Sequence, residues 1–338
     1  GYGGGAGSAN TTAGGVAGGG AGLGGAVFVR QGGSLSLTDV TFSSSNSVTG
    51  GTGGNAGSAE GAGLFLMGGG ALSYSVGAGR TATLGAGFEG DASLQLTKTG
   101  AGTLVIGAAG DFSSLTASAG TLRVNANLSG ASTTVQSGGT LQGTGTVGAL
   151  SVQSGGTLAP GASAGTLTTG ALTLAAGATL QQELAGTGSG QFDRISVTGA
   201  VNLGGATFSL SHLGGYSAAQ GAVLVIVDND GADAVVGTFA GLAQGASLSL
   251  AGFTYAISYV GGDGNDVTLT VTAVPDPPAL PTPSNPAPWS GTDGANTVMG
   301  GAGADSMSGQ GGDDSIAGAA GDDVVRGDEG ADYLHGNQ

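Results

Sequence analysis

The chain has 338 residues, of which 77 are glycine, none is cysteine and only 8% are charged. The absence of cysteine excludes a disulfide framework and thiol chemistry. The net charge of −16, from 22 acidic and 6 basic residues, argues against nucleic acid as a partner, because phosphate binding needs clustered Lys and Arg. Divalent cations are the natural complement of such a chain.

Residues 1–25 consist almost entirely of small residues, and the chain opens without Met inside this glycine tract. We interpret the sequence as a piece of a longer protein that is exported. No apolar run reaches the ~18 residues needed to cross a bilayer.

Residues 26–191 contain short aliphatic segments separated by glycine-rich turns, and the tripeptide GTL recurs through them. Within each unit Thr and Leu alternate, as they do in a half-buried strand. A recurring unit of this length predicts a solenoid, in which stacked units share one continuous core. Helix is disfavoured because each glycine costs about 1 kcal/mol relative to Ala. The GTL units begin at Gly102, Gly120, Gly139, Gly156 and Gly165.

Two segments, "LTKTGAGTLVI" at 96–106 and "GGAVFVRQGGSLSLTDVTFSSSNSV" at 24–48, resemble the passenger-associated strand repeats of bacterial autotransporters and large exported adhesins. The resemblance covers about two-thirds of the chain. It implies an all-β fold in which residues 1–272 form a right-handed parallel β-helix. Its N-terminal rungs would be rich in glycine, and the denser apolar zone at 192–272 would close it.

Residues 273–290 carry all but one of the 8 prolines. Such a segment cannot form a sheet ladder, so we expect an extended linker. Trp289 lies in this segment and could either pack against a neighbouring module or contact a partner.

The remaining residues, 291–338, parse without a gap into five nonapeptides of the form G-x-x-G-x-D-x-U-x, where U is a large aliphatic residue. This pattern resembles the repeats-in-toxin (RTX) family, whose repeats bind Ca²⁺ in a parallel β-roll. Nine of the 22 acidic residues fall here, against one basic residue, Arg326. The five repeats are "GTDGANTVM", "GGAGADSMS", "GQGGDDSIA", "GAAGDDVVR" and "GDEGADYLH".

Two nonapeptides make one 18-residue coil, so alternate repeats should lie on the same edge of the roll. Asp305 should then stack on Asp323, and Asn296, Asp314 and Asp332 should stack on the other edge. Carboxylates on neighbouring strands, ~4.8 Å apart, repel by roughly 1 kcal/mol in water and about 3.5 kcal/mol at a dielectric of 20. Ca²⁺ between successive turns removes this repulsion and would also bind turn carbonyls. We therefore expect metal binding to be coupled to folding.

Glycines at positions one and four of each repeat are expected to permit turns with positive φ. Asn296 departs from the consensus, which weakens the first site, and Asp332 has no following turn to complete its ligands. The alternative is that these acids merely make a glycine-rich linker soluble. The metal ligands that we predict in the tail are Asn296, Asp305, Asp313, Asp314, Asp322, Asp323 and Asp332.

Two further acidic stretches precede the tail. "GGDGNDVTL" places Asp266 at position six of a lone nonapeptide, which predicts either a hairpin turn or a single Ca²⁺ site. "VDNDGAD" offers Asp228, Asp230 and Asp233, but no Glu follows at the position that an EF-hand loop requires. A turn and a cation site both remain open for this stretch.

Candidate catalytic residues are sparse. Glu183 and Asp193 could be imagined as a glycosidase pair, but we expect an exposed pair on a loop. His212 and His335 lie far apart in the sequence, and we expect surface or turn positions for both.

An enzyme remains the alternative class, because β-helix and RTX modules also occur together in calcium-dependent polysaccharide epimerases and lyases. Such an enzyme needs acids, bases or His clustered on one face of the helix. Between residues 99 and 182 the only charged side chains are Asp111 and Arg123. We therefore predict that the chain is not an enzyme.

The sequence thus predicts an exported bacterial protein of the cell surface or extracellular matrix, stabilised by Ca²⁺. Its role would be adhesion, or assembly into an extracellular layer or filament. The expected partners are calcium ions, further copies of the chain, and a cell-surface or polysaccharide ligand, with no nucleic acid.

Overall fold

Strands are the only regular secondary structure in the part of the chain that the structure describes. The computed structural model describes residues 22–23, 25–31, 33–50, 59–67, 70–90, 94–231, 233–275 and 288–336, and none of them forms a helix long and apolar enough to span a membrane. The chain divides into two compact units, Gly1–Val274 and Pro275–Gln338. Most of the predicted glycine tract at 1–25 and of the predicted linker at 273–290 lies outside the described residues.

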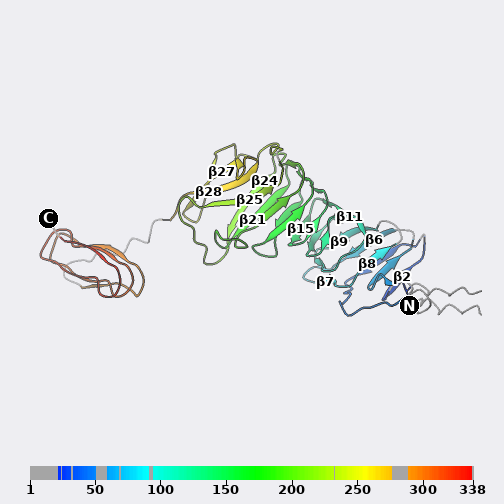
Figure 1. Ribbon diagram of the computed structural model, residues 1–338, viewed down its shortest axis with the longest axis horizontal. Helices are drawn as coiled ribbons and strands as arrows, with labels where there is room; N and C mark the ends of the chain where they lie inside the picture. Colours follow the sequence, from blue (N-terminus) through cyan, green and yellow to red (C-terminus); the bar gives the residue numbers. More distant parts are fainter. Residues whose placement is uncertain are drawn as a thin grey trace, which may run out of the picture. The chain divides into compact units, whose positions relative to one another are not determined.

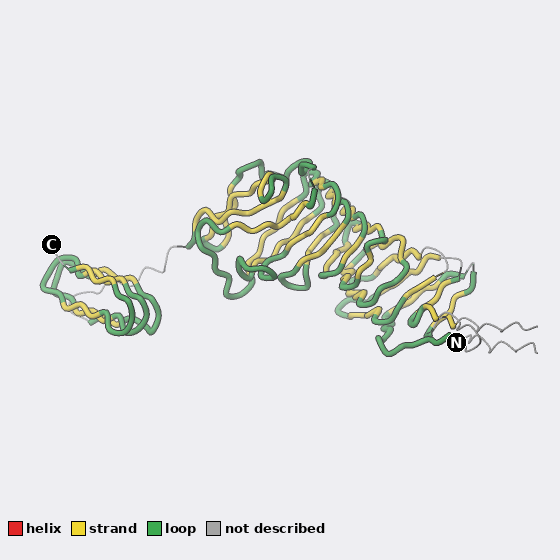
Figure 2. The backbone as a smooth tube through the Cα atoms, viewed as in Figure 1, coloured by secondary structure: helices red, strands yellow, loops and turns green. Residues whose placement is uncertain are grey.

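The first unit is a parallel β-helix whose coils stack strand upon strand (Figures 1 and 2). Three faces recur, and each face is a parallel sheet running through successive coils. The first contains β3 (Leu35–Thr38), β6 (Gly70–Ser75), β9 (Leu94–Thr99), β11 (Phe112–Ala117), β14 (Ser132–Val135), β17 (Leu150–Val152), β20 (Leu172–Leu174) and β23 (Val201–Asn202). The second contains β7 (Thr81–Leu84), β10 (Thr103–Ile106), β12 (Gly120–Val124), β15 (Gly139–Gly143), β18 (Thr157–Pro160), β21 (Thr179–Leu184) and β24 (Thr207–His212).

The third face has two parts. Early coils contribute β2 (Val27–Val29), β5 (Leu64–Leu66) and β8 (Phe88–Gly90). Later coils contribute β13 (Asn127–Leu128), β16 (Thr146–Val147), β19 (Thr166–Thr169), β22 (Arg194–Val197) and β25 (Val223–Asn229). A short pair, β1 (Gly22–Leu23) and β4 (Ala59–Glu60), is also parallel.

The first four GTL repeats set the register of the second face, whereas the fifth, at Gly165, leads into β19 on the third face. Leu104 pairs with Leu122, which pairs with Leu141, which pairs with Leu158, and all four are fully buried. The preceding threonines pair in the same way and point outward, as period-2 alternation requires. The repeat therefore encodes one inward aliphatic column and one outward hydroxyl column.

The glycine of GTL is required for close stacking of the coils. A Cβ atom at Gly102 would lie 2.1 Å from the carbonyl oxygen of Gly77, and one at Gly139 would lie 2.1 Å from that of Ala117. Since no side chain fits at such distances, these positions bring one coil directly against the backbone of the coil before it.

Antiparallel strands follow the last coil. β25 pairs antiparallel with β28 (Asp266–Ala273), which pairs with β27 (Phe253–Gly261), which pairs with β26 (Ser247–Leu250). Tyr255 and Phe239 are buried there, and the Tyr259 hydroxyl donates to Leu242 O at 2.7 Å. This zone thus has a larger aromatic core than the thin coils before it.

The second unit is a parallel β-roll of two small sheets (Figure 1). One sheet contains β29 (Trp289–Ser290), β31 (Ser306–Ser308) and β33 (Val324–Arg326), and the other contains β30 (Thr297–Met299), β32 (Ser315–Ala317) and β34 (Tyr333–His335). Its buried core consists of Val298, Met307 and Ile316, with Trp289 and Val325 packed against it. The predicted fold class, a parallel β-helix followed by a parallel β-roll, is confirmed.

Candidate metal centre

The sixth residues of the nonapeptides stack on one another through hydrogen bonds between coils. The Asp305 amide donates to Asp323 Oδ1 at 2.9 Å. On the other edge, the Asn296 amide donates to Asp314 Oδ1 at 2.7 Å, and the Asp314 amide donates to Asp332 Oδ1 at 3.0 Å. Each bond joins residues 18 positions apart, so the expected stacking of alternate repeats is what the structure shows.

The second carboxylate oxygens have a different environment. Asp314 Oδ2 and Asp323 Oδ2 are buried and have no hydrogen-bond partner. Asp305 Oδ2 accepts the Gly301 amide at 2.7 Å. Asp305 and Asp314 are only 4% and 2% exposed. A buried carboxylate oxygen without a donor is costly, and a cation is the partner that would offset this cost.

The glycine at position one of each repeat makes room for these oxygens. A Cβ atom at Gly309 would lie 2.0 Å from Asp314 Oδ2 and 2.6 Å from Gly327 O, and one at Gly318 would lie 2.6 Å from Asp323 Oδ2. The expectation that this glycine supplies a positive φ is wrong, since its φ is not in the left-handed region. Glycine is needed here for space. The carboxylate of the same repeat and a main-chain carbonyl of the next coil both lie close to its Cα atom.

In the last three repeats the left-handed conformation belongs instead to positions two and four. Position four follows the expectation at Gly312, Gly321 and Gly330, with φ of 97°, 133° and 136°, but not at Gly294 of the first repeat, whose φ is not positive. Position two of these repeats is held by non-glycine residues: Gln310, Ala319 and Asp328 have φ of 76°, 69° and 67°. Of these three residues only Asp is enriched at positive φ, so the conformation at Gln310 and Ala319 could not be predicted from residue type.

The remaining predicted ligands of the roll differ in how they are held. Asn296 Oδ1 accepts the Thr292 amide at 2.7 Å, so this oxygen is already engaged. Asp313 and Asp322 are exposed, and Asp313 Oδ1 accepts the Ala331 amide at 2.9 Å. Their role as metal ligands stays a prediction.

Sequence reasoning missed a second acidic group on the roll. Asp293, Asp328 and Glu329 line a cavity of about 400 Å³ together with Ser308 and Gln310. The Ser308 hydroxyl and the Gln310 amide donate to Asp328, and these bonds lower the pKa of its carboxyl. Asp328 lies at position two of its repeat, and Asp293 and Glu329 lie at position three. The consensus specifies no residue at these positions, so it could not predict this acidic group.

Within the described residues, no three side chains of His, Cys, Asp or Glu come together in an arrangement that holds a metal unaided. Ca²⁺ takes six to eight oxygen ligands, including main-chain carbonyls. The turn carbonyls beside the position-one glycines supply such oxygens, so carboxylate and carbonyl together fit the chemistry of Ca²⁺.

Outside the roll, Asp266 is the first residue of β28 and lies in the hairpin with β27. Burial raises the pKa of Asp266, and the nearby Asp228 and Asp263 carboxylates also raise it. Asp228 forms an ion pair with Arg194 at 2.5 Å. The hairpin-turn interpretation of the stretch around Asp266 is therefore confirmed.

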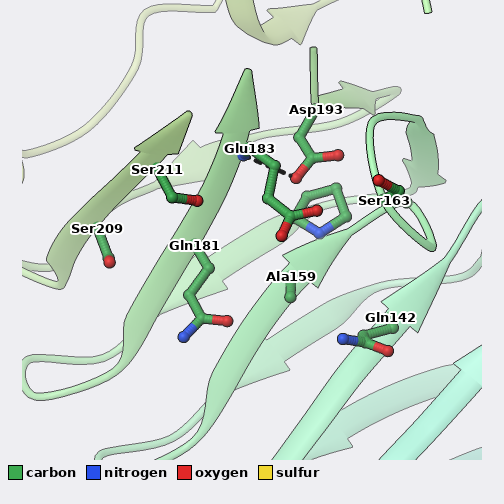
Figure 3. Close-up of a pocket in the computed structure, with 10 residues that line it drawn as sticks. Gln142, Ala159, Ser163, Gln181, Glu183, Asp193, Ser209 and Ser211 are labelled. Atoms are coloured by element: carbon green, nitrogen blue, oxygen red, sulfur yellow. Dashed lines mark hydrogen bonds between the residues drawn. The ribbon is translucent and has the colours of Figure 1, made fainter. Parts of the chain in front are cut away.

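The expectation of an exposed pair at Glu183 and Asp193 is wrong for Asp193, which is 1% exposed. Its Oδ1 accepts the Gly165 amide at 3.0 Å. Its Oδ2 accepts the Glu183 amide at 2.9 Å (Figure 3). Burial raises the pKa of Asp193 to about 7. The two residues line a polar cavity of about 290 Å³ with Gln142, Gln181, Ser163, Ser209 and Ser211. Asp193 thus fastens the loop at 161–165 to β21.

His212 also differs from expectation. It ends β24 rather than lying in a turn, and it is half-buried, with its Nε2 atom 2.7 Å from the Tyr255 hydroxyl. Its ring stacks on that of Tyr216, with centroids 4.1 Å apart, and burial lowers the pKa of His212. His335 lies in β34 and is exposed.

Comparison with protein families supports the metal chemistry of the second unit. Residues 290–325 and 308–338 match the RTX calcium-binding nonapeptide repeat. Such repeats are calcium-binding motifs, and they are typical of secreted proteins. The chain shows no match among curated proteins.

Proposed function

We propose that this chain is part of an extracellular structural protein of the bacterial surface, stabilised by Ca²⁺, which acts in adhesion or in assembly of an extracellular layer or filament. The proposal rests on two buried carboxylate oxygens, Asp314 Oδ2 and Asp323 Oδ2, that have no hydrogen-bond partner. Both lie in the segment that matches the RTX calcium-binding nonapeptide repeat. The residues that would hold Ca²⁺ are Asp305, Asp314, Asp323 and Asp332, with carbonyls of the position-one glycines.

Calcium would control the folding of the second unit. Its buried core is small, and stacked carboxylates oppose its closure unless a cation lies between them. At free Ca²⁺ a thousand times the Kd, one site adds about 4 kcal/mol to the stability of the folded form. Low Ca²⁺ inside the cell would leave the unit unfolded for export, and high Ca²⁺ outside would fold it.

The β-helix would serve as the structural part. Its second face presents a ladder of threonines, including Thr103, Thr121, Thr140 and Thr157, that pair from coil to coil. These hydroxyls are neutral, and charged side chains are rare along the coils. A long, regular and weakly charged surface suits lateral contact with a cell surface, a polysaccharide or another copy of the chain.

The alternative, a calcium-dependent polysaccharide epimerase or lyase, finds less support. The cavity beside Glu183 is the best place for proton transfer, because Asp193 has a pKa of about 7. Both Asp193 oxygens already accept main-chain amides, which is the arrangement of a residue that holds a loop in place. None of the residues that line this cavity is a His, Lys or Arg.

The test is the size of the full chain in solution, measured by light scattering with Ca²⁺ and with chelator. Growth in mass with Ca²⁺ alone supports assembly. A monomer that binds cells or polysaccharide only in Ca²⁺ supports adhesion. A chain that neither assembles nor binds a surface in Ca²⁺, or that turns over a polysaccharide, would overturn the proposal.

A further inference from the structure

Two acidic loops meet beside the last strands of the β-helix, and the residues that join them are 32 and 34 positions apart in the sequence. One follows β25, and the other is the turn between β27 and β28. They meet because β25 pairs with β28, with Val227 opposite Val267. The end of one strand therefore lies beside the start of the other.

The two loops are joined by side-chain amides. Asn229 Nδ2 donates to Asp233 O at 2.7 Å, and Asn265 Nδ2 donates to the same oxygen at 3.2 Å. Asn265 Nδ2 also donates to Gly231 O. The Asn229 main-chain amide donates to Asp266 Oδ1 at 2.9 Å. Two amides, two carbonyls and a carboxylate thus gather in one seam.

This seam leaves two oxygens unsatisfied. Asn229 is 1% exposed and Asn265 is 6% exposed, and in both the Oδ1 atom is buried without a hydrogen-bond partner. Because both amide groups surround the same Asp233 carbonyl, their oxygens belong to one locality. A buried amide oxygen without a hydrogen-bond donor is unfavourable. The seam therefore lacks a group, either a donor or a cation, that would bind these two oxygens.

The charge around the seam has the sign that a cation requires. Asp230, Asp233 and Asp263 belong to the two loops, and Asp228 and Asp266 lie at the adjoining ends of β25 and β28. Among the described residues, Arg194 is the basic residue that acts on Asp266. Arg194 is already paired with Asp228. The local excess of negative charge is therefore unbalanced.

We propose that this seam is a second calcium site, with the amide oxygens of Asn229 and Asn265 and the carboxylate of Asp266 as its side-chain ligands. The main-chain oxygens of Gly231 and Asp233 complete the set. With a single buried carboxylate, the site binds more weakly than the stacked aspartates of the β-roll, in the 10⁻⁴–10⁻³ M range of extracellular modules. Occupancy fastens the antiparallel strands to the last coil.

Amide hydrogen exchange on the full chain, followed by mass spectrometry, reads this site and the β-roll separately. With Ca²⁺ raised to about 10 mM, protection is expected to rise in peptides covering 229–236 and 261–268, at a higher midpoint than in peptides covering 291–336. Asp266→Asn keeps an oxygen for the Asn229 amide. It should shift the Ca²⁺ midpoint for protection of peptides 229–236 and 261–268 at least tenfold to higher Ca²⁺. Asp111→Asn, at an exposed position of the same unit, should leave it unchanged.

Should Asp266→Asn unfold the first unit in chelator, Asp263→Asn removes a nearby negative charge at an exposed position, leaves the named ligands in place and is expected to raise the midpoint. Peptides of 229–236 and 261–268 that ignore Ca²⁺ while those of 291–336 respond would overturn this inference alone. Peptides of 291–336 that ignore Ca²⁺ would instead overturn the proposed function.

Discussion

The position-one glycines offer a sharp test of how the β-roll binds calcium. In Gly309→Ala, the new Cβ atom would lie 2.0 Å from Asp314 Oδ2 and 2.6 Å from Gly327 O, whereas real Cβ atoms do not approach closer than 3.0 Å. The carboxylate must therefore retreat by about 1 Å. Since Ca²⁺ binds its oxygens at 2.3–2.6 Å, this shift removes a ligand. Loss of one site costs about 4 kcal/mol at free Ca²⁺ a thousand times the Kd.

The matched control lies two residues away. A Cβ atom at Gly311 would meet its nearest neighbour, Asp293 Cα, at 3.5 Å, which is an ordinary contact. Titration with Ca²⁺, followed by circular dichroism and by the fluorescence of Trp289, reports on the roll because Trp289 packs against its core. Gly309→Ala should need much more Ca²⁺ to fold than Gly311→Ala. Equal midpoints for the two variants would refute the geometry described for this site.

Three further substitutions test other parts of the account. Asp323→Asn removes one charge of a stacked pair and should stabilise the metal-free roll by between about 1 and about 3.5 kcal/mol while weakening its response to Ca²⁺; denaturant unfolding in chelator and in Ca²⁺ checks both signs. Lys98 is buried, its Nζ donates to Gly100 O at 2.5 Å and Ala119 O at 2.9 Å, and burial lowers its pKa. The unfolded chain therefore holds this proton to higher pH than the folded chain, so the stability of the β-helix should rise with pH between the two pKa values. Lys98→Met should abolish that rise in thermal melts between pH 8 and 11. A rise that persists in the variant would contradict the prediction. Asp193 has its pKa raised to about 7, so the folded chain holds this proton longer and its contribution to stability should fall as the pH rises from about 4 to about 7; Asp193→Asn should flatten this fall, and an unchanged pH profile would count against the buried position.

The parts of the fold that depend on local pattern could be predicted from the sequence. Alternating Thr and Leu after a glycine define one inward and one outward column whichever coil is considered. A period of nine, doubled to 18, is enough to place Asp305 beside Asp323. Both follow from repetition, because identical units stack in identical registers.

What escaped prediction depends on contacts between coils or on loop conformation. The sequence pattern predicts a turn glycine at position one. The structure shows instead that a carboxylate and a carbonyl lie too close to its Cα atom for a side chain to fit. Asp193 sits in a polar loop in the sequence, yet it is buried because two main-chain amides, from Gly165 and Glu183, converge on it.

The meeting of the stretches around Asp230 and Asp263 could not be predicted for a further reason. It requires the chain to leave the parallel pattern after β25 and return antiparallel in β28. The repeats of the preceding coils contain no signal for that change, so each stretch could only be interpreted as a separate turn or site.

The most direct test of the central claim is anomalous diffraction from a crystal of the full chain grown in Ca²⁺. The account predicts peaks beside Asp314 Oδ2 and Asp323 Oδ2, the buried oxygens that lack a partner in the protein. An ordered β-roll over residues 291–336 that shows no peak at either oxygen would contradict it.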